Sequence, residues 1–127
     1  MYSTFSSSVS EALNVPWAVT ADKVDAVVKR LVQVANPVKV ILFGSYVRGG
    51  IHRDSDLDVL VITDDTVKRP RLESARLRRS VRDISMPMDI LVVPKSQMEL
   101  LRTRRDLIYA EAHDSGTLVY ERDPALA

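Results

Sequence analysis

The 127-residue chain has the size of one domain, and its composition excludes several kinds of site. It has no cysteine, which excludes disulfides and thiolate metal sites, and its two histidines argue against a histidine-rich zinc site. A metal ion here would be a hard cation bound by carboxylates. With 18 basic and 17 acidic residues, the net charge of +1 gives no overall attraction for nucleic acid or for an anionic membrane.

The sequence carries no pattern typical of membrane insertion or secretion. No apolar run approaches the length of a membrane span, and the N-terminus lacks a basic stretch followed by an apolar one. We therefore expect a cytoplasmic protein. We divide the chain into an N-terminal extension at 1–20, one folded domain at 21–121 and a short tail at 122–127.

The first clear element along the chain is a helix that begins after Thr20. The serine-rich residues before it, 1–15, show only a weak amphipathic pattern. Thr20 is a favourable N-cap, and the valines and leucine between Val24 and Val34 form an apolar stripe at helical spacing. Asn36-Pro37 ends the helix.

Four short apolar runs then predict strands, at 38–43, 57–62, 88–93 and 117–120. Between them we expect a short helix after Gly44-Ser45, a helix from Pro70 to about Arg82, and a helical stretch capped by Ser96 and ended by Gly116. The side chains expected to be buried in the last two helices are Leu72, Ala75, Leu77 and Val81, then Met98, Leu100, Leu101, Leu107 and Ile108. This order predicts an α/β or α+β domain with a small mixed sheet.

Three aspartates lie at the beginnings of two predicted strands. Asp56 and Asp58 are two residues apart, so they point to the same face of a strand, and their mutual repulsion favours a cation between them. Asp89 begins the next strand in a similar apolar setting. If the two strands are neighbours, the three carboxylates converge at one edge of the sheet. Such a set can hold two divalent metals about 3.5–4 Å apart, the arrangement used for in-line displacement at phosphorus.

Gly44-Ser45 directly follows the first predicted strand. A strand that ends in Gly-Ser and turns into a short helix presents backbone N–H groups and a hydroxyl to an anion, and glycine permits close approach of the backbone. Arg48 lies one helical turn beyond Ser45 and can point toward the same phosphates. The sequence thus predicts a triphosphate-binding turn beside a carboxylate cluster.

Taken together, these residues resemble the signature of the polymerase-beta-like nucleotidyltransferase superfamily. The closer resemblance is to its minimal nucleotidyltransferases, whose run is Gly-Ser-x-Ala-Arg-Gly followed by Ser-Asp-x-Asp. The matching residues are Gly44, Ser45, Arg48, Gly49, Ser55, Asp56 and Asp58, with Asp89 as the third carboxylate and Val47 in place of the usual alanine. The resemblance spans roughly 24–120. It implies the polymerase-beta-like nucleotidyltransferase fold, a small mixed sheet flanked by helices.

The resemblance also implies a reaction, in which a nucleoside monophosphate, expected to be AMP from ATP, passes to an acceptor hydroxyl and pyrophosphate is released. Asp56 and Asp58 would bind both of two Mg²⁺ ions, with Mn²⁺ as an alternative. Asp89 would complete the metal nearer the acceptor and help to accept its proton. The nucleotide-binding residues implied are Gly44, Ser45, Arg48 and Ser55, of which Ser45 and Arg48 would hold the β- and γ-phosphates.

The acceptor implied is a partner protein, a small antibiotic-like molecule or RNA. Antibiotic-modifying relatives carry an added helical domain for which this chain has no room, which favours a protein. The chain resembles the antitoxin of HEPN/MNT toxin–antitoxin pairs, which adenylylates a tyrosine on a HEPN-type helical toxin. The Arg-x-x-x-x-His motif of that toxin is absent here. A homo- or hetero-oligomer is compatible with this role.

Two other functions stay open at this point. A non-catalytic antitoxin would keep the fold and mask its partner by docking, although a pure binder has no reason to keep three clustered aspartates. Polymerase-like action on nucleic acid is the weakest alternative, because the net charge is near neutral. The segment 68–82 holds seven Lys and Arg residues against Glu73 alone, and we interpret it as a solvated helix face rather than a binding surface.

Overall fold

The computed structural model describes residues 18–45, 47 and 56–123. The described elements are α2 (Ala21–Ala35), β1 (Lys39–Phe43), β2 (Leu57–Thr63), α4 (Pro70–Ser80), β3 (Met88–Pro94), α5 (Lys95–Leu101), α6 (Ile108–Ser115) and β4 (Thr117–Glu121). All four predicted strands are therefore confirmed to within one residue at either end. Residues 1–17 of the predicted extension, most of the predicted short helix after Gly44, and the end of the tail lie outside the described residues.

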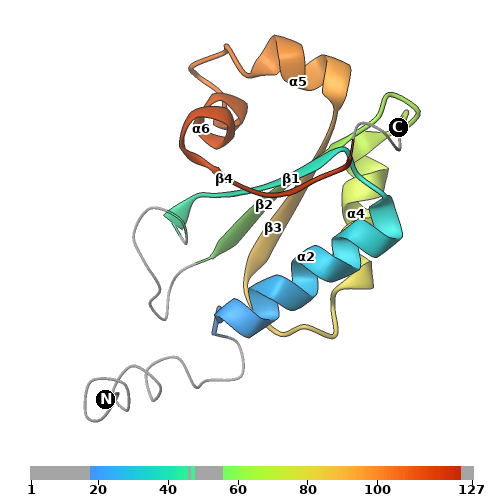
Figure 1. Cartoon of the computed structure of the whole chain (residues 1–127), viewed down its shortest axis with the longest axis vertical. Helices are drawn as coiled ribbons and strands as arrows, with labels where there is room; N and C mark the ends of the chain where they lie inside the picture. Colours follow the sequence, from blue (N-terminus) through green and yellow to red (C-terminus); the bar gives the residue numbers. More distant parts are fainter. Residues whose placement is uncertain (1–17, 46, 48–55, 124–127) are drawn as a thin grey trace.

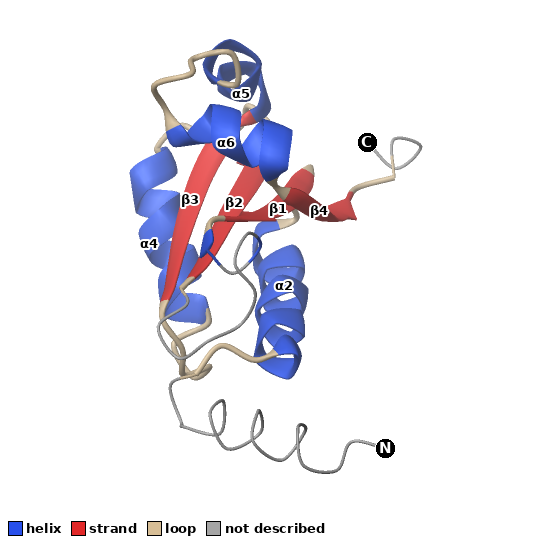
Figure 2. Ribbon diagram, turned by 90° about the vertical axis from the view of Figure 1, so that its left-hand side faces the viewer, coloured by secondary structure: helices blue, strands red, loops and turns tan. Residues whose placement is uncertain are grey.

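The four strands form one mixed sheet in the order β3-β2-β1-β4. The central strand β1 runs antiparallel to both of its neighbours, β2 and β4. The pair β2 and β3 is parallel, and α4 forms the crossover between them. Figure 2 shows the four strands side by side in this order. The predicted α/β domain with a small mixed sheet is confirmed.

Helices cover both faces of this sheet, with α2 and α4 on one face and α5 and α6 on the other (Figure 1). Successive strand residues point to opposite faces, so each face has its own apolar cluster. The first cluster joins α2 and α4 to Val40, Leu42, Leu57, Val59, Val61, Ile90 and Val92. The second joins α5 and α6 to Ile41, Phe43, Leu60, Ile62 and Val93. Even and odd positions of one strand thus belong to different layers.

Helix α2 begins and ends as the sequence predicts. The Thr20 hydroxyl accepts a hydrogen bond from the Lys23 backbone N–H at 3.3 Å, which satisfies one of the free donors of the first turn. Asn36 ends the helix with a left-handed φ of 46°, a conformation that asparagine tolerates well. Ala18 and Val19, which precede the helix, are already buried, and Val19 packs in the core.

Helix α4 has the predicted proline in its first turn, but only part of its predicted buried side is correct. Leu77 and Val81 are fully buried, whereas Leu72 is 59% exposed and Ala75 is exposed. The face that meets the sheet passes through Ser74, Leu77 and Val81, spaced by three and four residues. The Ser74 hydroxyl accepts a hydrogen bond from the Val92 backbone N–H at 3.1 Å, so a polar residue lies at a position that the apolar pattern did not reveal.

The last predicted helical stretch is two helices, α5 and α6, and the prediction of its cap and buried face is partly wrong. Ser96 lies inside α5, and its backbone N–H donates to the Asp65 side chain at 3.1 Å. A residue distant in the sequence therefore accepts a hydrogen bond from a free backbone N–H at the start of α5. Met98 is buried as expected, but Leu100 is 73% exposed and Ile108 is 44% exposed.

The C-terminal side of β4 is held to the body of the domain by Arg122, the first residue of the predicted tail. Its backbone N–H donates to the Val38 carbonyl at 2.9 Å. Its guanidinium donates to the carbonyls of Asn36 and Pro37 and forms an ion pair with Asp64. Among the described residues, no helix is both long enough and apolar enough to cross a membrane.

Candidate active site

Two of the predicted site aspartates face each other across neighbouring strands. Asp58 and Asp89 are register partners in the parallel pair β2 and β3. Asp58 alternates with Leu60 and Ile62, which pack under α5 and α6, so both carboxylates lie on that face of the sheet. Neighbouring strands are about 4.8 Å apart. The prediction that the two strands are neighbours is confirmed, and it brings Asp58 and Asp89 together. The predicted convergence of all three carboxylates is not seen in the described residues, where no three acidic side chains are grouped.

The alignment of the two strands is fixed where they begin. The Leu57 backbone N–H donates to the Pro87 carbonyl at 3.1 Å. Leu57 directly precedes Asp58, and Pro87 lies two residues before Asp89. Leu57 and Met88 are both buried on the opposite face. A slip of one residue would expose these side chains and turn the aspartates into the α2–α4 core, so burial holds the carboxylates in place.

Gly44 directly follows β1 and lies against the Asp58 side chain. Its φ of +84° is a conformation that residues with a side chain rarely adopt. A Cβ atom at this position would lie 2.0 Å from Oδ2 of Asp58. The sequence predicts close backbone approach at Gly44, and the structure shows that the carboxylate of Asp58 is what approaches it. Only glycine fits at this position.

Ser45 connects the two halves of the sequence motif. Its hydroxyl lies 3.4 Å from both the backbone N and the carbonyl O of Asp56, at the long end of the hydrogen-bond range. The turn continues with a hydrogen bond from the Val47 N–H to the Gly44 carbonyl at 3.1 Å. Gly44-Ser45 and Asp56-x-Asp58 thus meet in space, as their spacing in the sequence implies. Arg48 and Ser55, the other predicted nucleotide-binding residues, lie outside the described residues.

A cavity of about 390 Å³ opens over the two carboxylates. It is lined by Phe43, Gly44, Asp58, Asp89, Ile90, Leu91, Ile108 and Glu111. Strand residues form its floor, and α6 supplies the last two. Asp56 is exposed and does not line this cavity. Glu111 is a site residue that sequence reasoning missed, because nothing in its local pattern indicates that α6 folds back over β1 and β2.

The donor set suits a hard divalent cation, since Asp56, Asp58 and Asp89 offer only carboxylate oxygens. Within residues 18–45, 47 and 56–123, no three His, Cys, Asp or Glu side chains are grouped closely enough to hold a metal ion. Magnesium at phosphate-transfer sites is bound by one or two carboxylates together with substrate phosphates and water. The Asp58–Asp89 pair fits that second kind of site, which is completed by the substrate.

The sequence matches the nucleotidyltransferase domain family over residues 22–114, most of the chain. The chain belongs to this family. The matched span of this nucleotidyltransferase contains the Gly44-Ser45 turn, the paired aspartates and Glu111. Its fold is similar to that of a candidate nucleotidyltransferase from Sulfolobus solfataricus, with a TM-score of 0.55, 16% identity and coverage of 81% of each chain. At that identity, the likeness bears on the fold alone. No curated protein matches significantly.

Proposed function

We propose that this nucleotidyltransferase transfers AMP from ATP to a hydroxyl of a partner protein by a two-metal mechanism. The observation that carries the proposal is the pairing of Asp58 and Asp89 on one face of the sheet, beside the Gly44 turn. The family supports nucleotidyl transfer in general. The resemblance to minimal nucleotidyltransferases supports ATP as donor and a HEPN-type toxin as partner, with this chain as its antitoxin.

On the donor side, the Gly44-Ser45 turn binds the triphosphate. Glycine keeps the turn free of a side chain beside Asp58, and the Ser45 hydroxyl is near enough to the Asp56 backbone to hold the two motif halves together. Arg48 and Ser55 are included among the nucleotide-binding residues because they match the sequence motif. Arginine suits phosphate because its planar guanidinium donates paired hydrogen bonds.

On the acceptor side, the acceptor oxygen attacks the α-phosphorus of ATP. A new bond forms between that oxygen and the α-phosphorus, the bond from the α-phosphorus to the oxygen bridging to the β-phosphate breaks, and pyrophosphate leaves. Asp89 accepts the hydroxyl proton on a carboxylate oxygen. Asp56, Asp58 and Asp89 would hold two Mg²⁺ ions, which when bound stabilise negative charge on the attacking and leaving oxygens.

The proposal is tested with the full chain and the protein with which it co-purifies. After incubation with ATP and Mg²⁺, intact-mass spectrometry should show the partner heavier by one or more AMP units. Asp58→Asn and Asp89→Asn should each slow this gain by roughly a hundredfold or more, because several kcal/mol of charge stabilisation in the transition state is lost.

Glu99→Gln is the matched control, since Glu99 is an exposed carboxylate on α5 that pairs only with Arg102 in the described structure. It should transfer AMP at the wild-type rate. An unmodified partner that still binds tightly would contradict the proposal and favour the masking antitoxin. Full transfer by Asp58→Asn would show that the chemistry takes place elsewhere.

A further inference from the structure

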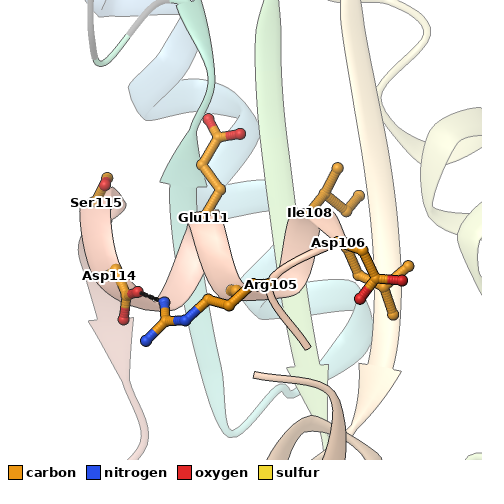
Figure 3. A pocket seen from close by; sticks show the side chains of 8 residues that line it. Arg105, Asp106, Ile108, Glu111, Asp114 and Ser115 are labelled. Atoms are coloured by element: carbon orange, nitrogen blue, oxygen red, sulfur yellow. Dashed lines mark hydrogen bonds and ion pairs between the residues drawn. The ribbon is translucent and has the colours of Figure 1, made fainter. Parts of the chain in front are cut away.

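The segment 69–82, which contains α4, carries arginines that have no acidic partner among the described residues. Each described arginine outside this segment forms an ion pair with an acidic side chain. Figure 3 shows one such pair, between Arg105 and Asp114. Within the segment, Arg76 pairs with Glu73. The arginines whose side chains make no hydrogen bond or ion pair in the described structure are Arg69, Arg71, Arg78, Arg79 and Arg82.

The acidic side chains of this part of the chain are already paired with other arginines. Glu73 accepts hydrogen bonds from Arg76 at 2.8 and 2.6 Å, and Asp83 accepts them from Arg30 of α2 at 3.0 and 3.3 Å. These hydrogen bonds hold the pKa of each carboxyl below its ordinary value. Both carboxylates are therefore charged near neutral pH, and each is matched by one arginine. The remaining arginines give this side of the molecule a positive surface.

The unpaired arginines surround exposed apolar side chains on the outward side of α4. A shallow groove of about 480 Å³ runs along this side, and Leu72, which is 59% exposed, and Ala75 lie in it. Arg69 lies one helical turn before Leu72, and Arg79 lies two turns after it. Apolar side chains inside a polar, arginine-rich rim are typical of protein-binding surfaces. The segment 68–82 has no aromatic side chain on which a nucleic acid base could stack.

This side of α4 borders the strand that carries Asp89. Arg71 and Arg78 are seven residues apart and share one flank of the helix, whereas Arg76 reaches α2 through the Val34 carbonyl. The flank of Arg71 and Arg78 thus faces the outer strand β3, beside which α4 lies in Figure 2. Because α4 is the crossover between parallel strands, its C-terminal end lies where β3 begins, next to Asp89. The cavity over the carboxylates is on the other face of the sheet, so a partner on α4 leaves it open.

We propose that this basic surface of α4 docks an acidic face of the acceptor protein. The carboxylates of the partner supply what the described chain lacks, since arginine binds a carboxylate through two parallel hydrogen bonds. Leu72 is buried against the partner at the centre of the contact. The naming of the acceptor as the occupant rests on the proposed function. The proposal revises the interpretation of 68–82 as a solvated helix face, because the sequence does not show which arginines find partners. The surface comprises Arg69, Arg71, Arg78, Arg79 and Arg82 around Leu72.

The test measures binding of the full chain to the purified protein with which it co-purifies, without ATP, at low and at high salt. Arg71→Glu and Arg79→Glu should each slow association about tenfold at low salt and much less at high salt, because charge at an interface acts mainly on association. Both side chains are exposed, so urea unfolding should be nearly unchanged. Lys29→Glu reverses a charge on the side of α2 that faces β4 and should leave association unchanged.

Two further variants identify the chemistry of the partner. Arg79→Lys keeps the charge and introduces an amine that a carbodiimide couples to carboxylates. Peptide mass spectrometry of the treated complex should show a cross-link from position 79 to an Asp or Glu of the partner, and none from Lys29. Leu72→Ala should speed dissociation about tenfold through lost apolar contact. An RNA duplex that binds the wild type and not Arg79→Glu, while partner binding is unchanged, would overturn the proposal in favour of a nucleic acid surface.

Transfer assays separate failure of this inference from failure of the proposed function. Arg71→Glu and Arg79→Glu should raise the KM for the partner about tenfold and leave kcat unchanged, since they weaken docking and not the chemistry. Association at the wild-type rate by both variants would refute the docking surface, even if AMP is transferred. Slow association by both variants, with no AMP transferred by the wild type, would leave the docking surface standing and refute the proposed function.

Discussion

Several structural constraints act on Asp58. It is half-buried, pairs with Asp89 across the parallel strands and has the Gly44 backbone against its carboxylate. A half-buried carboxylate beside another is destabilising unless a cation or hydrogen-bond donors compensate it. Natural sequences retain such local costs where function requires them. We therefore regard this position as the centre of the site.

At the residue scale, Gly44→Ala should be strongly destabilising. The new Cβ would overlap Oδ2 of Asp58, and alanine is strained at a φ of +84°. We expect the free energy of unfolding to fall by about 2–4 kcal/mol, from overlap and backbone strain together. Urea unfolding measures this. AMP transfer should fall as well, because Asp58 must move to make room.

A double-mutant cycle separates the two causes of that loss. In an Asp58→Ala background, the carboxylate that would clash is gone, so Gly44→Ala should cost only about 1 kcal/mol from the backbone conformation. An equal cost in both backgrounds would show that contact with Asp58 is irrelevant to the choice of glycine. The result bears directly on how the turn and the carboxylate are positioned.

At the element scale, a charged pair on α4 makes stability depend on pH. Arg76 donates to both carboxylate oxygens of Glu73, at 2.8 and 2.6 Å, which holds the pKa of Glu73 below its ordinary value. Arg76 also donates to the Val34 carbonyl at the end of α2. The pair therefore supports the packing of α4 on α2 as well as the helix itself.

A group with a lowered folded pKa stabilises the fold fully above its unfolded pKa, and this stabilisation is lost as pH falls through the folded value. Glu73→Gln should therefore lower the free energy of unfolding at about pH 7, by a few tenths to about 1 kcal/mol for a partly exposed pair. Near pH 2 the difference between variant and wild type should vanish, since Glu73 is then protonated. Urea unfolding at both pH values checks this, and a constant difference would refute it.

The helices and strands are predictable from the sequence where a local signal is sufficient to specify them. Apolar runs identify all four strands, and Thr20 and Asn36 mark the ends of α2. The predictions are wrong where contact with a residue distant in the sequence determines the local structure. Asp65 satisfies the start of α5 in place of Ser96, and contact with β3 selects a face of α4 that includes Ser74 and leaves Leu72 exposed.

The candidate site was predictable to a similar extent, and for the same reason. Asp58 and Asp89 each begin an apolar strand, so parallel pairing of the two strands brings them together. Glu111 was not predictable, because its place in the site depends on α6 turning back over the sheet after the irregular segment 102–107. Periodicity along one segment does not specify which layer of the molecule that segment will cover.

At the scale of the whole molecule, the two helical layers have different structural roles. The α2–α4 layer buries the larger apolar cluster, which fixes the strand register. The α5–α6 layer covers the face that bears the carboxylates and contributes Ile108 and Glu111 to the cavity over them. The site therefore lies between the sheet and the α5–α6 layer.

The central claim is that this site transfers the nucleotidyl group of ATP and not its terminal phosphate. The most direct measurement compares ATP radiolabelled at the α-phosphate with ATP radiolabelled at the γ-phosphate, each incubated with the full chain, Mg²⁺ and the co-purified partner. We predict label on the partner from the α-labelled ATP alone, label in pyrophosphate from the γ-labelled ATP, and neither with Asp58→Asn or EDTA. Label on the partner from γ-labelled ATP would contradict the account.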